Sequence, residues 1–237
     1  VAKDEFLALV AHELRTPLSV LYGGTHLLIQ HNEALGEDGR HDLLRNLALE
    51  SERLKGLVES LLLLVNPSPS VDLAPARVLN EVSKAIAEFE REAPSRPVAL
   101  VATQEEIVAS IEPSLFQRVM LNLLGNADKY SPRGRAIEVT VGREAGDIVL
   151  EVRDRGPGVD PAELGLIFSS FYRTSTAIDS APGKGLGLAI CKRLVELMGG
   201  AIEARARDGG GLVVRFTLPL FELTADAALP PQVRSQA

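Results

Sequence analysis

The first part of the chain carries leucine and valine at the spacing of amphipathic helices. Apolar residues recur every three or four positions over residues 3–31 and again over residues 40–65. The short polar connection between them, residues 36–39, is typical of a turn between antiparallel helices. The pattern predicts a helical hairpin. Because each helix would leave an apolar stripe that one partner cannot cover, we expect two hairpins to pack as a dimeric four-helix bundle.

The pattern changes after a linker rich in proline and serine at residues 66–70. Beyond it, helices expected at about 75–92, 113–130 and 186–198 alternate with strands expected at about 97–102, 136–142, 147–153, 201–207 and 211–219. Such a mixture predicts an α+β domain with mainly antiparallel strands. The expected divisions are a hairpin domain over residues 1–66, a second domain over 71–221 and a disordered tail over 222–237.

Composition and charge narrow the classes of protein. The chain has 237 residues, of which 46% are apolar and 24% charged, and its net charge of −7 argues against general nucleic-acid binding. No stretch has the length and apolarity of a membrane span. The single cysteine, Cys191, favours a reducing compartment such as the cytosol. Because the chain opens without methionine on an amphipathic pattern, we expect a cytoplasmic piece of a longer protein, with any membrane contact made by an upstream region.

One histidine in the first helix has chemically suggestive neighbours. His12 is followed by Glu13, and Thr16 lies one turn later on the same face. Pro17 has no N–H and favours a kink beside the histidine. A carboxylate and a hydroxyl in these positions could orient and polarise the imidazole for nucleophilic attack, although an isolated histidine on a helix face is commonly only solvated. A zinc-protease motif is excluded, because Thr16 stands where that motif needs histidine.

Three segments of the second domain are suited to a nucleotide. Asn122, Asn126 and Lys129 form one polar stripe on an otherwise apolar helix, which would suit phosphate-bound Mg²⁺ or could be an exposed edge. In the D-x-G-x-G segment over 154–158, an aspartate could accept a hydrogen bond from the adenine amine, although the same pattern is also a common turn. The glycine-rich segment over 183–188 opens a helix whose N–H groups would face phosphate. It matches neither the dinucleotide-binding fingerprint nor a P-loop.

The motifs and their order resemble a known family. His-Glu-Leu-Arg-Thr-Pro is followed by N-x-x-x-N-x-x-K-Y, D-x-G-x-G, I-F-x-x-F-Y-R and G-x-G-x-G-L. This series resembles the kinase core of bacterial two-component sensor histidine kinases over about residues 3–220. The resemblance implies a homodimeric helical hairpin followed by an α/β sandwich that binds ATP and Mg²⁺. It also implies a partner, the receiver domain of a response regulator.

The resemblance further implies roles for matching residues. His12 would be the phosphoacceptor, Glu13 the acid/base residue beside it, and Thr16 a residue that positions water during dephosphorylation of the regulator. Asn126 would ligate Mg²⁺ and Asp154 would hold adenine. The other residues expected at the ATP site are Asn122, Lys129, Tyr130, Gly156, Gly158, Phe168, Phe171, Tyr172, Gly183, Gly185, Leu186, Gly187 and Leu188. Arg173 would offset the charge of the transferring γ-phosphoryl group.

Two features depart from the usual pattern, and two other functions compete. Lys184 stands where the family often has serine or threonine, and Gly23-Gly24 interrupts the first helix as either a bend or a close helix contact. An ATP-hydrolysing machine of the gyrase and heat-shock chaperone kind would need a glutamate where Asn122 stands. The other alternative is a degenerate kinase that serves only as a scaffold or a phosphatase.

Overall fold

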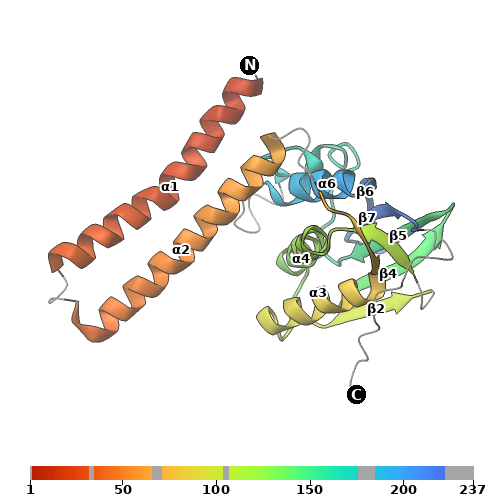
Figure 1. Cartoon of the computed structure of the whole chain (residues 1–237), viewed down its shortest axis with the longest axis horizontal. Helices are drawn as coiled ribbons and strands as arrows, with labels where there is room; N and C mark the ends of the chain where they lie inside the picture. The colour runs from red at the N-terminus through yellow and green to blue at the C-terminus, as the bar shows by residue number, and fades with distance from the viewer. Residues whose placement is uncertain (1, 32–34, 66–70, 104–106, 176–184, 222–237) are drawn as a thin grey trace. The chain divides into compact units, whose positions relative to one another are not determined.

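The computed structural model describes residues 2–31, 35–65, 71–103, 107–175 and 185–221 (Figure 1). The chain divides into two compact units, Val1–Ser68 and Pro69–Ala237, which we call the hairpin unit and the sheet unit. The expected linker at 66–70, the expected tail at 222–237, and Gly183 and Lys184 lie outside the described residues. No helix in the described ranges has the length and apolarity needed to cross a membrane.

The hairpin unit consists of two long helices, α1 (Ala2–His31) and α2 (Gly36–Val65), which run antiparallel (Figure 1). The apolar spacing therefore predicted both helices. α1 continues through Pro17, which is buried. Hydrophobic side chains remain exposed along the unit, including Tyr22 at 73% and Ile29 at 80%. Two helices alone leave much of their apolar surface in water, as the sequence pattern predicted.

The glycine pair in α1 marks a close contact between the helices. A Cβ atom added at Gly24 would lie 2.6 Å from Cδ2 of Leu47 on α2, whereas one added at Gly23 would meet nothing within 4 Å. Leu47 is only 8% exposed, so its side chain fills the space that Gly24 leaves. The close-contact interpretation therefore holds for Gly24, and Gly23 takes no part in the contact.

The sheet unit is built on five strands in the order β2-β4-β5-β7-β6. Their bounds are β2 (Val98–Ala102), β4 (Ile137–Glu144), β5 (Asp147–Arg153), β6 (Ile202–Ala206) and β7 (Leu212–Pro219). The β2–β4 pair is parallel and the other pairs are antiparallel, as expected from the sequence. Alternate residues of the strands face the helices, and Leu150 of β5, opposite Phe216 of β7, is fully buried with it.

Helices α3 (Val78–Glu92), α4 (Pro113–Tyr130) and α6 (Gly187–Leu197) cover one face of this sheet (Figure 1). α4 lies between α3 and α6 and contacts both. Its Phe116 meets Phe216 of β7 edge to face, with ring centroids 6.2 Å apart. Cys191 of α6 is fully buried, and burial raises the pKa of its thiol to about 12, so the thiol stays protonated at neutral pH.

Two short strands and a 3₁₀ turn were not predicted. β1 (Ala74–Arg77) pairs antiparallel with β3 (Val108–Ile111), and the turn η1 spans Leu166–Phe168. The helix expected from about residue 75 consequently begins at Val78, whose N–H donates to the Ile107 carbonyl. Four-residue strands give too short a pattern to establish a period, and β1 is paired with β3, which is distant in sequence.

Candidate functional site: an exposed histidine and three converging motifs

His12 lies exposed on α1, and the neighbours identified from the sequence lie beside it on the same helix. Thr16 is exposed, and its hydroxyl donates to the backbone carbonyl of His12 over a long 3.5 Å. Glu13 is half-buried. Pro17, the next residue after Thr16, offers no N–H to the Glu13 carbonyl, which a normal helix would satisfy from that position. The imidazole therefore stands on an accessible face of a helix that is locally weakened next to it.

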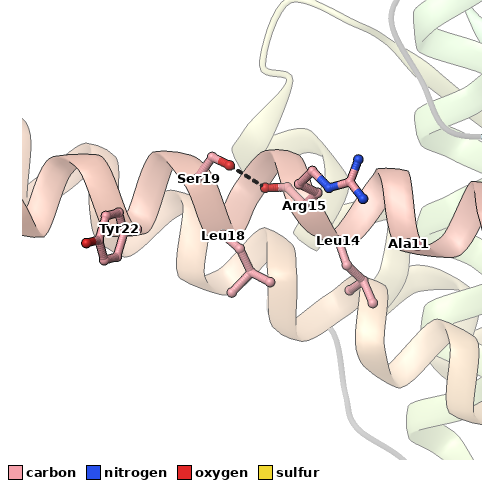
Figure 2. Close-up of a pocket in the computed structure, with 6 residues that line it drawn as sticks. All are labelled: Ala11, Leu14, Arg15, Leu18, Ser19 and Tyr22. Atoms are coloured by element: carbon pink, nitrogen blue, oxygen red, sulfur yellow. Dashed lines mark hydrogen bonds between the residues drawn. The ribbon is translucent and has the colours of Figure 1, made fainter.

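A shallow groove runs along α1 next to this face (Figure 2). Its lining is mainly apolar and consists of Ala11, Leu14, Arg15, Leu18, Ser19 and Tyr22. The Ser19 hydroxyl donates to the Arg15 carbonyl at 2.9 Å, so this polar group is satisfied within the helix. Apart from the exposed Arg15, the groove presents mainly apolar surface, with Leu18 53% exposed and Tyr22 73% exposed.

In the sheet unit, α4 carries the polar stripe that its sequence predicted. Asn122, Asn126 and Lys129 are half-buried, whereas the opposite face of the helix is in the core. Tyr130 ends the helix, and the Lys129 ammonium lies 4.9 Å from the centre of its ring. Amides and a cation at the edge of a hydrophobic core have little reason to lie there unless polar groups of a ligand face them.

Asp154 follows strand β5 directly and is 8% exposed. Its Oδ1 accepts the N–H of Gly156 at 2.7 Å and the N–H of Leu212 at 3.1 Å. Burial raises the pKa of this carboxyl, against the opposing effect of the two N–H donors and of the Arg207 guanidinium, which favour the ionised form. Asp154 is therefore a desolvated carboxylate whose position is set by backbone donors.

Three residues that hold Asp154 were missed by the sequence analysis. Arg207, at the end of β6, donates to the Asp154 carbonyl at 3.1 Å and to the carboxylate of Glu138. The Asp154 N–H donates to the Leu212 carbonyl, and the Leu212 N–H donates to Oδ1 of Asp154. A Cβ atom on Gly211 would lie 2.2 Å from the Asp154 carbonyl oxygen. The run of three glycines at 209–211, each with positive φ, was the available signal of a tight hairpin.

The remaining motifs meet α4 and each other. Gly187, the first residue of α6, lies against the amide stripe, because a Cβ atom there would be 3.6 Å from Asn122 Oδ1 and 3.7 Å from Asn126 Nδ2. Gly156 approaches the other end of α4, where a Cβ atom would be 2.9 Å from the Tyr130 carbonyl oxygen. The structure thus brings the asparagine stripe, the aspartate turn and the start of α6 together.

The aromatic segment is tied to the glycine-rich one. The Phe171 N–H donates to the Gly185 carbonyl at 2.8 Å. Phe171 has φ +64° and Gly185 φ +68°, and a side chain on Gly185 would collide with the backbone of Phe171 and Tyr172. The Tyr172 hydroxyl donates to Glu163 at 2.7 Å, while Phe168 and Arg173 are half-buried. A left-handed phenylalanine costs about 1–3 kcal/mol, and such strain is typical of functional sites.

Most of the expected ATP-site residues are brought together: those on α4, in the aspartate turn and around Gly185 and Gly187. Three others contribute differently. Leu186 is 6% exposed and belongs to the core, so only its backbone can face a ligand, and Leu188 is half-buried. Gly158 has φ +78°, and a Cβ atom there would be 3.3 Å from the Gly211 carbonyl oxygen, so it packs on the hairpin that holds Asp154.

Two domain families match the chain. The His Kinase A (phospho-acceptor) domain matches residues 2–68, and the histidine kinase-, DNA gyrase B-, and HSP90-like ATPase domain matches residues 111–222. The chain belongs to the bacterial sensor histidine kinases. The first of these domains carries His12 and the second carries the converging motifs, which makes the sheet unit an ATP-binding domain.

Individual sensor kinases are similar over nearly the whole chain. The sensor protein KdpD of Clostridium acetobutylicum is 32% identical over 92% of this chain and 25% of its own length. The sensor protein CutS of Streptomyces coelicolor is 35% identical over 92% of this chain and 53% of its own length. Full-length ShkA, solved in complex with AMPPNP, is 27% identical with a TM-score of 0.68, covering 93% of this chain and 47% of that one. The chain thus spans a quarter to about half of the length of these relatives.

Proposed function

We propose that this histidine kinase core transfers the γ-phosphoryl group of ATP to His12 and then to an aspartate of a response regulator. The observation that carries the proposal is the convergence of the asparagine stripe, the Asp154 turn and the glycine-rich start of α6 in one unit, with an exposed histidine on the other. The AMPPNP bound by the related ShkA supports a nucleoside triphosphate as the ligand.

Asp154 would select adenine. Both backbone bonds that the described residues make to its carboxylate end on Oδ1. Oδ2 is then the oxygen that accepts a hydrogen bond from the exocyclic amine of adenine, a donor that guanine does not offer at that position. Gly156 and Gly158 would shape this side of the site by letting the turn pack closely on the end of α4 and on the β6–β7 hairpin.

The α4 stripe would hold the phosphates and Mg²⁺. Mg²⁺ prefers oxygen ligands and keeps several waters, so the Asn126 amide oxygen would suffice as the main protein ligand. The described residues contain no group of three His, Cys, Asp or Glu side chains able to hold a metal alone, which fits an ion carried in by the nucleotide. When bound, Mg²⁺ would neutralise charge on the phosphate oxygens. Asn122, Lys129, Tyr130 and the N–H groups around Gly185 and Gly187 would contact the triphosphate.

The transfer itself needs positioning and charge compensation. A ring nitrogen of His12 forms a bond to the γ-phosphorus while the bond to the bridging oxygen breaks, and ADP leaves. Glu13 would hold the proton of the other ring nitrogen, and Arg173 would offset the charge of the γ-phosphoryl group. Phe168 and Phe171 would shape this side of the pocket. Thr16 would position water when the phosphorylated regulator is hydrolysed.

The hairpin would function as a homodimer. The apolar groove of α1 shown in Figure 2 would be buried against a second copy, so that two hairpins form a four-helix bundle. The polar face that carries His12 and Thr16 would then remain open to the receiver domain of the regulator. This division gives the apolar surface to a permanent contact and the polar surface to a transient one.

A labelling experiment tests the proposal. With Mg²⁺ and ATP labelled in the γ-phosphate, the wild-type chain should acquire acid-labile label that a receiver domain removes. His12→Gln should abolish the label while leaving ATP binding intact, and Asp154→Asn should abolish both. His26→Gln, which alters another exposed histidine of α1, is the matched control and should keep the label. Label retained on His12→Gln would overturn the assignment of His12 as the phosphoacceptor. Fast ATP turnover independent of His12 would instead support a conformational ATPase.

A further inference from the structure

A buried arginine outside the recognised motifs organises the end of α4. Arg96 lies in the connection between α3 and β2, and its side chain is 5% exposed. Its Nε donates to the Asp128 carboxylate. Its Nη1 donates to the carbonyls of Pro132 and Arg135 at 2.7 and 2.9 Å, and its Nη2 to those of Asp128 and Ser131, both at 3.1 Å. All five donors of one guanidinium are thus used on residues 128–135.

This arrangement fixes the shape of that segment. The last carbonyls of a helix have no partner within the helix, and the negative end of the helix dipole favours a cation there. Arg96 supplies both the donors and the charge. A lysine would keep the charge but could not reproduce the planar fork that reaches four separate carbonyls. Replacing Arg96 would therefore remove the donor from four carbonyls at and beyond the end of α4.

The same segment forms the contact between two parts of the ATP site. The Ser131 hydroxyl accepts the N–H of Arg155 at 3.1 Å, and the Tyr130 carbonyl approaches Gly156 closely. Both contacts join the end of α4 to the turn that begins with Asp154. The segment that Arg96 holds thus sets the spacing between the proposed phosphate contacts on α4 and the proposed adenine contact.

We infer that Arg96 is a positioning residue for the nucleotide, which holds the phosphate-binding stripe of α4 in register with the adenine-binding turn. The inference rests on the proposed function. A loss of positioning should affect ADP and adenosine differently, whereas a general loss of protein stability should affect both ligands alike. ADP spans both parts of the site and depends on their spacing, whereas adenosine contacts only the turn. Loss of Arg96 should therefore weaken ADP much more than adenosine.

The test measures both ligands on the full chain by competition with a fluorescent ATP analogue. Arg96→Gln should weaken ADP by about tenfold or more, because a displacement of about 1 Å in a site has effects of that size, and should leave adenosine nearly unchanged. Arg96→Lys should resemble Arg96→Gln. Asp128→Ala, which removes one of the five acceptors, should shift the ratio of ADP to adenosine affinity in the same direction by less, and it carries the test if Arg96→Gln does not fold.

Ile148→Val is the matched control, because it loosens the core at a fully buried position of β5 outside this segment. It should leave the ratio of affinities at the wild-type value. If the Arg96 or Asp128 variants also keep the wild-type ratio, the inference is overturned and the proposed function stands. If the wild-type chain binds neither ADP nor adenosine, the proposed function fails and the inference fails with it.

Discussion

Asp154 shows how one side chain depends on residues far from it in sequence. Its carboxylate and its own backbone are held by Arg207, Gly211 and Leu212 from the β6–β7 hairpin. Burial raises its pKa, and the N–H donors and the Arg207 guanidinium oppose that rise. The position of the proposed adenine contact is therefore a property of the β6–β7 hairpin as much as of the D-x-G-x-G turn.

The three-glycine turn offers a matched pair of substitutions. Gly210 and Gly211 have φ of +96° and +109°, so alanine at either position should cost about 1–3 kcal/mol of stability through backbone strain. Only at Gly211 would the added Cβ atom collide with Asp154, at 2.2 Å from its carbonyl oxygen, whereas nothing lies within 4 Å at Gly210. Gly211→Ala should therefore also weaken ATP binding by about tenfold or more.

Calorimetric titration of ATP at a temperature well below unfolding checks this prediction. Gly210→Ala should bind ATP as the wild type does, because its strain is not transmitted to Asp154. Equal loss of affinity in the two variants would show that the hairpin acts only through stability and does not position the carboxylate.

Residue types at fixed spacing were enough to single out Asp154, Asn122 and Asn126 as candidates, because each lies in a local motif. Local motifs carry no information about partners that come from other elements. Arg207 reaches Asp154 from 53 residues away, and Arg96 reaches Asp128 from 32 residues away. Their roles follow from the pairing of strands and the packing of α4, which no spacing rule encodes.

The two long helices of the hairpin unit pack closely where Gly24 of α1 meets Leu47 of α2. Gly24 lies against Leu47, whereas its neighbour Gly23 is exposed and faces open space. Gly23→Ala should stabilise the hairpin by about 1 kcal/mol, because alanine favours the helix by that amount. Gly24→Ala has the same intrinsic gain but must displace the buried Leu47 side chain or separate the helices, so it should be at least about 1 kcal/mol less stable than Gly23→Ala.

Hydrogen exchange of α1 and α2 amides in the full chain measures this difference, because it reports the hairpin separately from the sheet unit. Slower exchange in Gly23→Ala and faster exchange in Gly24→Ala is the expected result. Equal slowing in both variants would mean that Leu47 moves aside freely and that the pair has no packing role.

The elements that were predicted correctly are those with a sustained period. Both hairpin helices, α4, α6 and the five main strands show such periods over five or more residues, and their apolar faces are the ones that are buried. β1 was merged into the following helix, although Pro75 and Arg77 lie in a strand that pairs with Ser110 and Val108. β1 is stabilised by that pairing and not by its own four residues, so the local sequence pattern alone predicted a helix there.

In the sheet unit as a whole, the face of the sheet that points away from the helices carries ion pairs between charged side chains. The strand residues that point away from the helices include Glu138, Glu151, Arg153, Arg205 and Arg215. Glu151 is only 7% exposed and accepts from Arg153 at 2.9 Å and from Arg205 at 3.0 Å. One face of the sheet is therefore apolar and covered by helices, and the other is joined across strands by ion pairs.

These pairs make the unit sensitive to acid. Burial alone would raise the pKa of Glu151, but the hydrogen bonds from Arg153 and Arg205 outweigh it and hold the pKa below its ordinary value. For Glu138, the hydrogen bond from Arg207 is the main cause of a lowered pKa. A carboxyl with a lowered pKa stabilises the folded state fully above its unfolded value of about 4.3, and this contribution is lost as the pH falls through the folded value.

Glu151→Gln should therefore cost about 1–3 kcal/mol at pH 7, since it removes hydrogen bonds to charged groups. The difference in unfolding free energy between wild type and variant should shrink as the pH is lowered below about 4.3, because the wild type then loses the same carboxylate. Asp154 acts in the opposite direction, since its raised pKa favours the folded state at lower pH, but it is present in both proteins and cancels. Urea unfolding at a series of pH values measures the difference.

Glu203→Gln is the matched control. The Glu203 side chain is 63% exposed and bonds only to Arg215 among the described residues, so its removal should cost about 0–1 kcal/mol. A Glu151 difference that stays constant with pH would mean that packing of the side chain, and not its charge, stabilises this face.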